Sequence, residues 1–105
     1  METLDLARYF ADFINRYGAE NVQILQAQNS KMFDYLIVCT APSKEFAQNL
    51  LVDLLSYAKN EFNQINSGLE GYKKAEWIIV DYGKLLVHIL SPQNREKFCL
   101  EKLWN

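Results

Sequence analysis

Two apolar runs joined by a short glycine-containing turn constrain the fold of this chain more than any other feature. The runs span residues 76–81 and 85–90, and Tyr82-Gly83 between them supplies the glycine that a tight turn with positive φ requires. A two-residue turn at Tyr82-Gly83 predicts a β-hairpin in which Trp77 pairs with His88. Because side chains alternate along a strand, one face of this hairpin is entirely aliphatic and suited to packing under helices. Its residues are Ile78, Val80, Leu85, Val87 and Ile89.

The opposite face of the predicted hairpin has a mixed chemistry. It combines Trp77 with His88, the single histidine of the chain, and with Asp81 near the turn. A tryptophan with an adjacent polar rim is typical of the centre of a protein interface, so this face is a candidate partner-binding surface. The pattern equally permits a closing helix to cover the face, with Trp77 in the core and His88 as a buried imidazole whose hydrogen bonds are satisfied. Neither interpretation supplies a nucleophile beside a general base.

Three helices are expected in the rest of the chain. Apolar residues recur at helical spacing from Thr3, the expected N-cap, to Gly18, which can adopt the left-handed conformation that ends helices. A second helix is expected from the cap Ser43 to about residue 62. The closing helix is expected from Ser91-Pro92 to about Trp104, since serine caps a helix and proline suits its first position.

A second pair of strands completes the predicted order. Residues 22–28 and 34–40 are rich in β-branched and aromatic side chains and flank the turn-prone Asn29-Ser30-Lys31, which predicts another hairpin. The order is therefore α-β-β-α-β-β-α. It indicates an α+β fold in which a mixed sheet of at least four strands packs with helices, and a length of 105 residues fits a single domain over residues 1–105.

Charge and composition exclude several classes of function. The formal net charge is −2, and Lys73-Lys74 is the only adjacent basic pair, so little or no direct contact with nucleic acid is expected. No apolar run approaches the ~20 residues that cross a bilayer, and the acidic start of the chain does not resemble a secretory signal, so we expect no membrane contact and a cytoplasmic protein. Cys39 and Cys99 lack the spacing of a metal or redox motif, so no cofactor or metal is expected.

Several separated motifs occur in an order that resembles one family, the ribosomal silencing factors or Iojap family, over nearly the whole chain. They are the strand Asp34-Tyr35-Leu36-Ile37-Val38-Cys39-Thr40 followed by Ser43, the loop Glu70-Gly71, the hairpin elements Trp77-Ile78-Ile79-Val80-Asp81-Tyr82-Gly83 and Val87-His88, and the closing Arg95 and Leu100-Glu101-Lys102-Leu103-Trp104. Three departures stand beside them. Ala41-Pro42 replaces a glycine, Lys84 replaces an acid, and Phe98-Cys99 replaces a tyrosine pair.

The resemblance implies a non-enzymatic factor that binds the large ribosomal subunit. Its partner would be the fourteenth large-subunit protein, at the face that meets the small subunit, and occupying that face would block subunit joining and repress translation when nutrients are scarce. An acidic domain suits a basic ribosomal protein. The mixed hairpin face and the family motifs together give eight candidate partner-binding residues. They are Trp77, His88, Asp81, Glu70, Ile79, Leu86, Asp34 and Tyr35.

Two alternatives remain open. The family's fold is similar to that of nucleotidyltransferases, which hold Mg²⁺ with an Asp-x-Asp pair on a strand after a Gly-Ser turn. This chain has Asn29-Ser30 and then Asp34, but residue 36 is leucine, so the second carboxylate is missing. Asp53 and Asp81 could substitute only from a helix and a turn. The other alternative is an interaction module that self-associates through the Trp77 face, so the protein could be a monomer or a homodimer.

Overall fold

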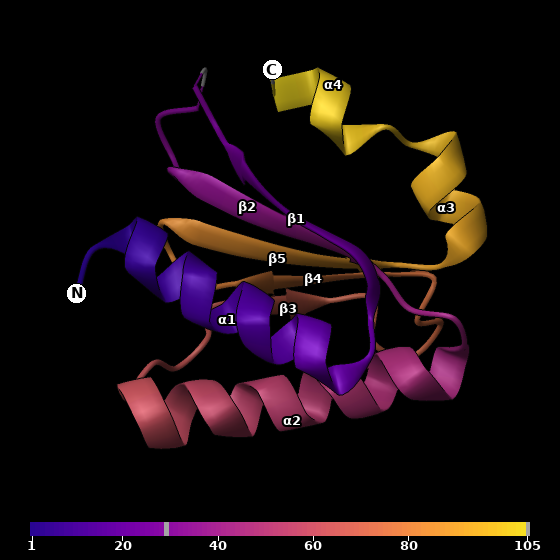
Figure 1. Cartoon of the computed structure of the whole chain (residues 1–105), viewed down its shortest axis with the longest axis horizontal. Helices are drawn as coiled ribbons and strands as arrows, with labels where there is room; N and C mark the ends of the chain where they lie inside the picture. Colours follow the sequence, from indigo (N-terminus) through magenta and orange to yellow (C-terminus); the bar gives the residue numbers. More distant parts are fainter. Residues whose placement is uncertain (29, 105) are drawn as a thin grey trace.

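The structure, a computed structural model, describes residues 1–28 and 30–104, with the side chains of residues 103 and 104 left out (Figure 1). Asn29 of the predicted turn and the side chains of the closing Leu103-Trp104 therefore lie outside the described part. The elements are α1 (Thr3–Tyr17), β1 (Glu20–Gln26), β2 (Tyr35–Thr40), α2 (Lys44–Phe62), β3 (Gly68–Glu70), β4 (Trp77–Asp81), β5 (Leu85–Leu90), α3 (Pro92–Lys97) and α4 (Leu100–Trp104).

The described strands form one mixed sheet of five strands in the order β1-β2-β5-β4-β3. β2 and β5 run parallel, and the other neighbouring strands are antiparallel. α1 and α2 lie against one face of the sheet, whereas α3 and α4 lie over the other face (Figure 1). The α+β class and the mixed sheet of at least four strands are confirmed.

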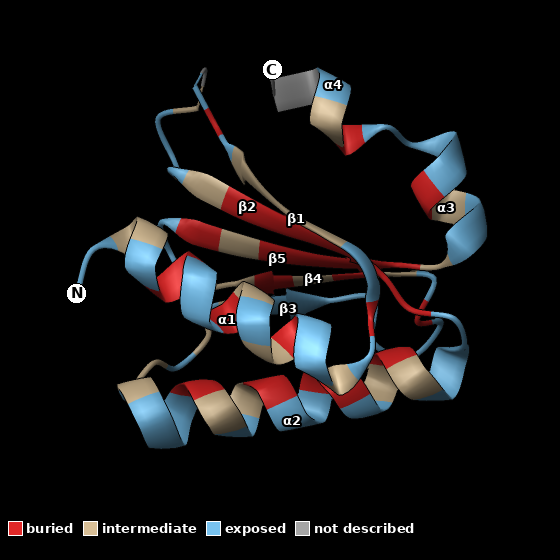
Figure 2. Cartoon of the chain, viewed as in Figure 1, coloured by how far each residue is buried: buried red, intermediate tan, exposed pale blue. Residues whose placement is uncertain are grey.

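The main core lies between the sheet and the pair α1 and α2 (Figure 2). The predicted aliphatic face of the hairpin is confirmed, because all five of its residues are buried in this core. A smaller core lies on the other face, where α4 reaches the sheet. Its buried residues are Ala27, Leu36, Val38, Leu90 and Leu100.

Local capping accounts for the start of α2 and the end of α1. The Ser43 hydroxyl accepts a hydrogen bond from the Phe46 N–H at 3.1 Å, as the sequence predicts. The predicted Thr3 cap is wrong by one residue, because Thr3 is already helical and Glu2 occupies the cap position. Gly18 ends α1 in the left-handed conformation, with φ of 115°.

The central hairpin is shifted by two residues from the predicted register. Its two-residue turn is Gly83-Lys84, flanked by a hydrogen bond of 2.9 Å from the Tyr82 N–H to the Leu85 carbonyl oxygen. Gly83, with φ of 84°, takes the first turn position, and the Asp81 carboxylate accepts its N–H at 2.7 Å. A shift of two residues leaves every side chain on its predicted face, because the period of a strand is two.

Three further differences separate the structure from the sequence prediction. β1 covers residues 20–26 rather than 22–28, with an irregular register between Glu20 and Gln23. The segment that contains Glu70 was expected to be a loop, yet it pairs with β4 as the edge strand β3. The closing helix is interrupted, because Phe98 is extended and turns the chain, so that Leu100 enters the smaller core while the Phe98 ring packs on Trp77.

Candidate functional surface

The sheet face that α1 and α2 leave free carries most of the predicted partner-binding residues, and we call it the outer face. The strand register aligns its side chains in three rows. The rows are Glu70–Ile79–His88–Val38, Gly68–Asp81–Leu86–Leu36 and Trp77–Leu90–Thr40. Six of the eight predicted residues, from three different strands, therefore share this face.

The C-terminal segment covers the outer face only in part. Over β2 and the end of β5, Leu36, Val38 and Leu90 are buried with Leu100 of α4. Toward β3 the side chains of the face are half-buried or exposed, so the C-terminal segment covers one part of the predicted hairpin face and leaves the other part uncovered.

The open part of the outer face is an apolar strip with acidic borders, which we call the open strip: Glu70, Ile79, Asp81 and Leu86. Ile79, Asp81 and Leu86 are half-buried and Glu70 is exposed. They line a depression of about 380 Å³ together with Gly68 and Leu69. Carboxylates beside aliphatic side chains match a partner that presents basic and apolar groups together. Lys84 is exposed at the adjoining turn.

Trp77 stands between the covered and open parts and is held from two sides. Its Nε1–H donates to His88 Nδ1 at 3.0 Å, and its ring lies 5.0 Å from that of Phe98. Trp77 itself is half-buried. A large aromatic ring that is fixed in place before binding loses little side-chain entropy when it contacts a partner, which suits an interface anchor.

His88 is a neutral imidazole that orients Trp77. It is 8% exposed, and burial lowers its pKa to about 4, because an imidazolium loses its hydration in this position. Its Nδ1 must be unprotonated to accept the Trp77 N–H, so Nε2 carries the proton at neutral pH. The closing-helix alternative therefore described His88 correctly as a buried histidine with a hydrogen-bond partner.

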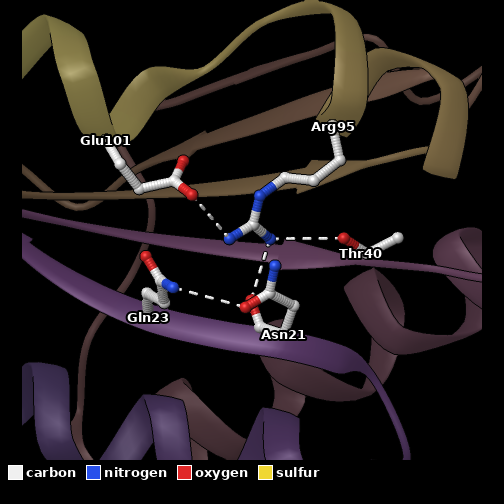
Figure 3. Close-up of polar contacts among 5 residues, drawn as sticks. All are labelled: Asn21, Gln23, Thr40, Arg95 and Glu101. Carbon is white, nitrogen blue, oxygen red and sulfur yellow. Dashed lines mark hydrogen bonds and ion pairs between the residues drawn. The ribbon is translucent and has the colours of Figure 1, made fainter.

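A buried arginine fixes the C-terminal segment on the outer face (Figure 3). Arg95 of α3 is 8% exposed, and its Nη1 donates to the Asn21 carbonyl oxygen at 2.8 Å and to Thr40 Oγ1 at 3.2 Å. Its Nη2 lies 3.3 Å from Glu101 Oε2 at the start of α4. Arg95 thus ties both short helices to β1 and β2. The sequence identified Arg95 and Glu101 only as parts of a motif, because their pairing depends on the break at Phe98.

Asp34 and Tyr35 do not join the other six predicted residues. Tyr35 pairs with Leu85 and packs against the main core, so its side chain lies on the face opposite Trp77. Asp34 is exposed before β2, and its N–H donates to the Lys84 carbonyl oxygen at 2.8 Å. Both line a separate hollow of about 570 Å³ beside the start of α1. The alternation within residues 34–40 could have shown that Tyr35 and Leu36 face opposite sides.

The carboxylates that the enzyme alternative requires are dispersed. Asp53 accepts a hydrogen bond from the Tyr17 hydroxyl at 2.7 Å on the helical side, and Asp81 is engaged at the hairpin turn. Among the residues the structure describes, no group of three or more His, Cys, Asp or Glu side chains could hold a metal ion. In the same part of the chain, no helix combines the length and hydropathy needed to cross a membrane.

Comparison with known proteins gives consistent matches over the whole chain. The family model described as "Ribosomal silencing factor during starvation" matches residues 1–105. The ribosomal silencing factor of Haemophilus influenzae is 33% identical over 104 residues, covering 99% of this chain and 92% of that protein. Its counterpart in Halalkalibacterium halodurans is 29% identical over 105 residues, covering 99% and 89%. A crystal structure from Chromobacterium violaceum superposes with a TM-score of 0.92 at 25% identity, covering 99% of this chain and 87% of that one.

Proposed function

Because the chain belongs to the family of ribosomal silencing factors, we propose that it binds the large ribosomal subunit and prevents that subunit from joining the small one. The partner is the fourteenth large-subunit protein, at the face that meets the small subunit. Binding represses translation when nutrients are scarce, and the site of action is the cytoplasm, where the subunits join.

The open strip is the observation that carries this proposal. Ile79 and Leu86 give an apolar centre, Glu70 and Asp81 give it negative borders, and Trp77 adds a fixed aromatic anchor beside it. Ribosomal proteins are commonly basic because they neutralise RNA phosphates, so an acidic and apolar strip suits one of them better than it suits RNA. The net charge of −2 also favours a basic protein partner over RNA.

To block subunit joining, the protein needs only to occupy the contact face of the large subunit. A domain with a radius of gyration of 12.5 Å and extents of 32 × 32 × 23 Å occupies the contact face of a subunit by its bulk. Because His88 and Phe98 already hold the Trp77 ring in place, the ring loses less side-chain entropy when the protein binds the subunit. No bond is made or broken, and we propose that the protein is not an enzyme and uses neither a metal nor a nucleotide.

Photo-crosslinking from the open strip tests the partner. Replacing Leu86 with p-benzoylphenylalanine puts a reactive ketone in the apolar centre, and irradiation with isolated large subunits should yield one main adduct, with the fourteenth protein. The same replacement at Met32, which is 82% exposed on the β1–β2 loop, is the control for random collision. A Leu86 adduct with ribosomal RNA, or the same adduct pattern from both positions, would contradict the proposed partner.

A further inference from the structure

β3 leaves one edge of the sheet without a neighbouring strand in the part of the chain that the structure describes. The sheet ends with β3, which pairs only with β4 in those residues. An edge strand presents backbone N–H and C=O groups to which another extended segment can bind. β3 borders the open strip directly, since Glu70 pairs with Ile79 and Gly68 with Asp81.

The other side of this edge is apolar. Leu69 pairs with Val80, whose side chain is buried beneath the helices, so Leu69 also points to the helical side, where it is 41% exposed. Gln48 of α2 donates to the Tyr72 carbonyl oxygen at 2.9 Å, which brings α2 beside the chain that follows β3. Val52 lies one turn further along the same side of α2 and is 51% exposed. We call Val52, Leu69 and Tyr72 the apolar margin.

The two sides of the edge thus differ in chemistry. On the outer face, Glu70 and Asp81 present carboxylates, whereas Leu69 presents an exposed aliphatic side chain on the helical face. Val52 of α2 and Tyr72, whose backbone lies beside α2, add further exposed apolar groups along this edge. The depression of about 380 Å³ includes both Leu69 and Glu70, so it reaches the edge itself. Exposed apolar groups beside a free strand edge favour a binding surface.

We propose that β3 receives an extended segment of the partner protein, in which basic and apolar side chains alternate. Successive side chains of an added strand point to opposite faces of the sheet. Those on the outer face meet Glu70 and Asp81, so they are lysine or arginine. Those on the helical face meet the apolar margin, so they are aliphatic. This inference extends the proposed function by naming the partner's segment, and it depends on that function only for the partner's identity.

Peptide binding to the whole protein tests the inference without ribosomes. One six-residue peptide alternates lysine and valine, and the other has the same composition with three lysines followed by three valines. In amide NMR spectra of the labelled protein, the alternating peptide should shift signals of residues 68–72 and 79–81, whereas the block peptide should bind at least tenfold more weakly. Leu69→Lys should weaken the alternating peptide at least tenfold, and Met32→Lys should leave its affinity unchanged.

Three results would overturn the inference: no shifts along β3, equal affinity for the two peptides, or equal binding by Leu69→Lys and the wild type. A homodimer in sedimentation that Leu69→Lys dissociates would also overturn it, because a second copy would then occupy the edge. Amide spectra of each variant show whether it is folded, and Val52→Lys provides a second substitution outside the sheet if Leu69→Lys is not. Failure of the wild type to bind large subunits would contradict the proposed function. The peptide measurements would still show whether β3 binds an extended segment.

Discussion

Protonation of His88 should destabilise the protein, since the folded state holds this imidazole neutral. Its pKa falls from the ordinary 6.5 to about 4 on burial, and its Nδ1 accepts the Trp77 N–H at 3.0 Å. Between these two pH values the unfolded chain binds more protons than the folded one. The contribution of His88 to the free energy of unfolding is therefore fully present above pH 6.5 and is lost as the pH decreases toward 4.

The expected loss follows from the two pKa values. From pH 7 to pH 5 the linkage relation gives a contribution from His88 of about 2 kcal/mol. Urea unfolding at both pH values measures the total change, which also includes the carboxylates. His88→Asn is the matched variant, because its amide oxygen can still accept the Trp77 N–H but does not titrate. The wild type should lose about 2 kcal/mol more than His88→Asn over this interval. Equal losses would refute the conclusion that His88 is buried and neutral.

Two further predictions concern the supports of the outer face. Gly71→Ala should cost clearly more stability in urea unfolding than Gly83→Ala. Both glycines have φ of 84°, which costs an alanine about 1–2 kcal/mol, but only at Gly71 would the new Cβ collide with a backbone atom, the Trp77 carbonyl oxygen. Equal destabilisation by the two substitutions would refute the close approach of Gly71 to the Trp77 carbonyl. Arg95→Met should cost about 3–5 kcal/mol, because it removes the donor to the Asn21 carbonyl oxygen and to the Thr40 hydroxyl as well as the charged partner of Glu101. Glu101→Gln should cost less, because Arg95 keeps its bonds to Asn21 and Thr40. A Tm unchanged by Arg95→Met would show that Arg95 does not anchor the C-terminal segment.

Local chemistry made much of the fold predictable. The Ser43 cap depends on bonds within one turn of helix, and the aliphatic face of the hairpin depends only on alternation. Both predictions are therefore confirmed even though the predicted register of the hairpin is wrong. The predicted register of the hairpin was wrong because the register depends on which turn position Gly83 occupies. The Asp81 carboxylate, which accepts the Gly83 N–H, helps to place Gly83 in the first position.

Long-range packing made the rest unpredictable. β3 has three residues, too few to show a pattern, and it becomes a strand because β4 lies beside it. The break at Phe98 follows from the simultaneous burial of Leu100 and contact of Phe98 with Trp77, which are features of the folded outer face. How much of that face stays open depends on where the C-terminal segment lies, and the sequence therefore left the two interpretations of Trp77 undecided.

A subunit-joining assay with Ile79→Lys tests whether the open strip is the surface through which the protein blocks joining. The substitution puts a positive charge in the apolar centre of the open strip, facing a basic partner, whereas Met32→Lys adds the same charge at an exposed apolar residue on the β1–β2 loop. Sucrose gradients with purified subunits would give the protein concentration that halves joining. We predict that Ile79→Lys, while remaining folded, requires at least about thirtyfold more protein, equivalent to a loss of about 2 kcal/mol, and that Met32→Lys matches the wild type. Equal inhibition by all three proteins would contradict the role of the open strip, and no inhibition by the wild type at saturation would contradict the proposed silencing function.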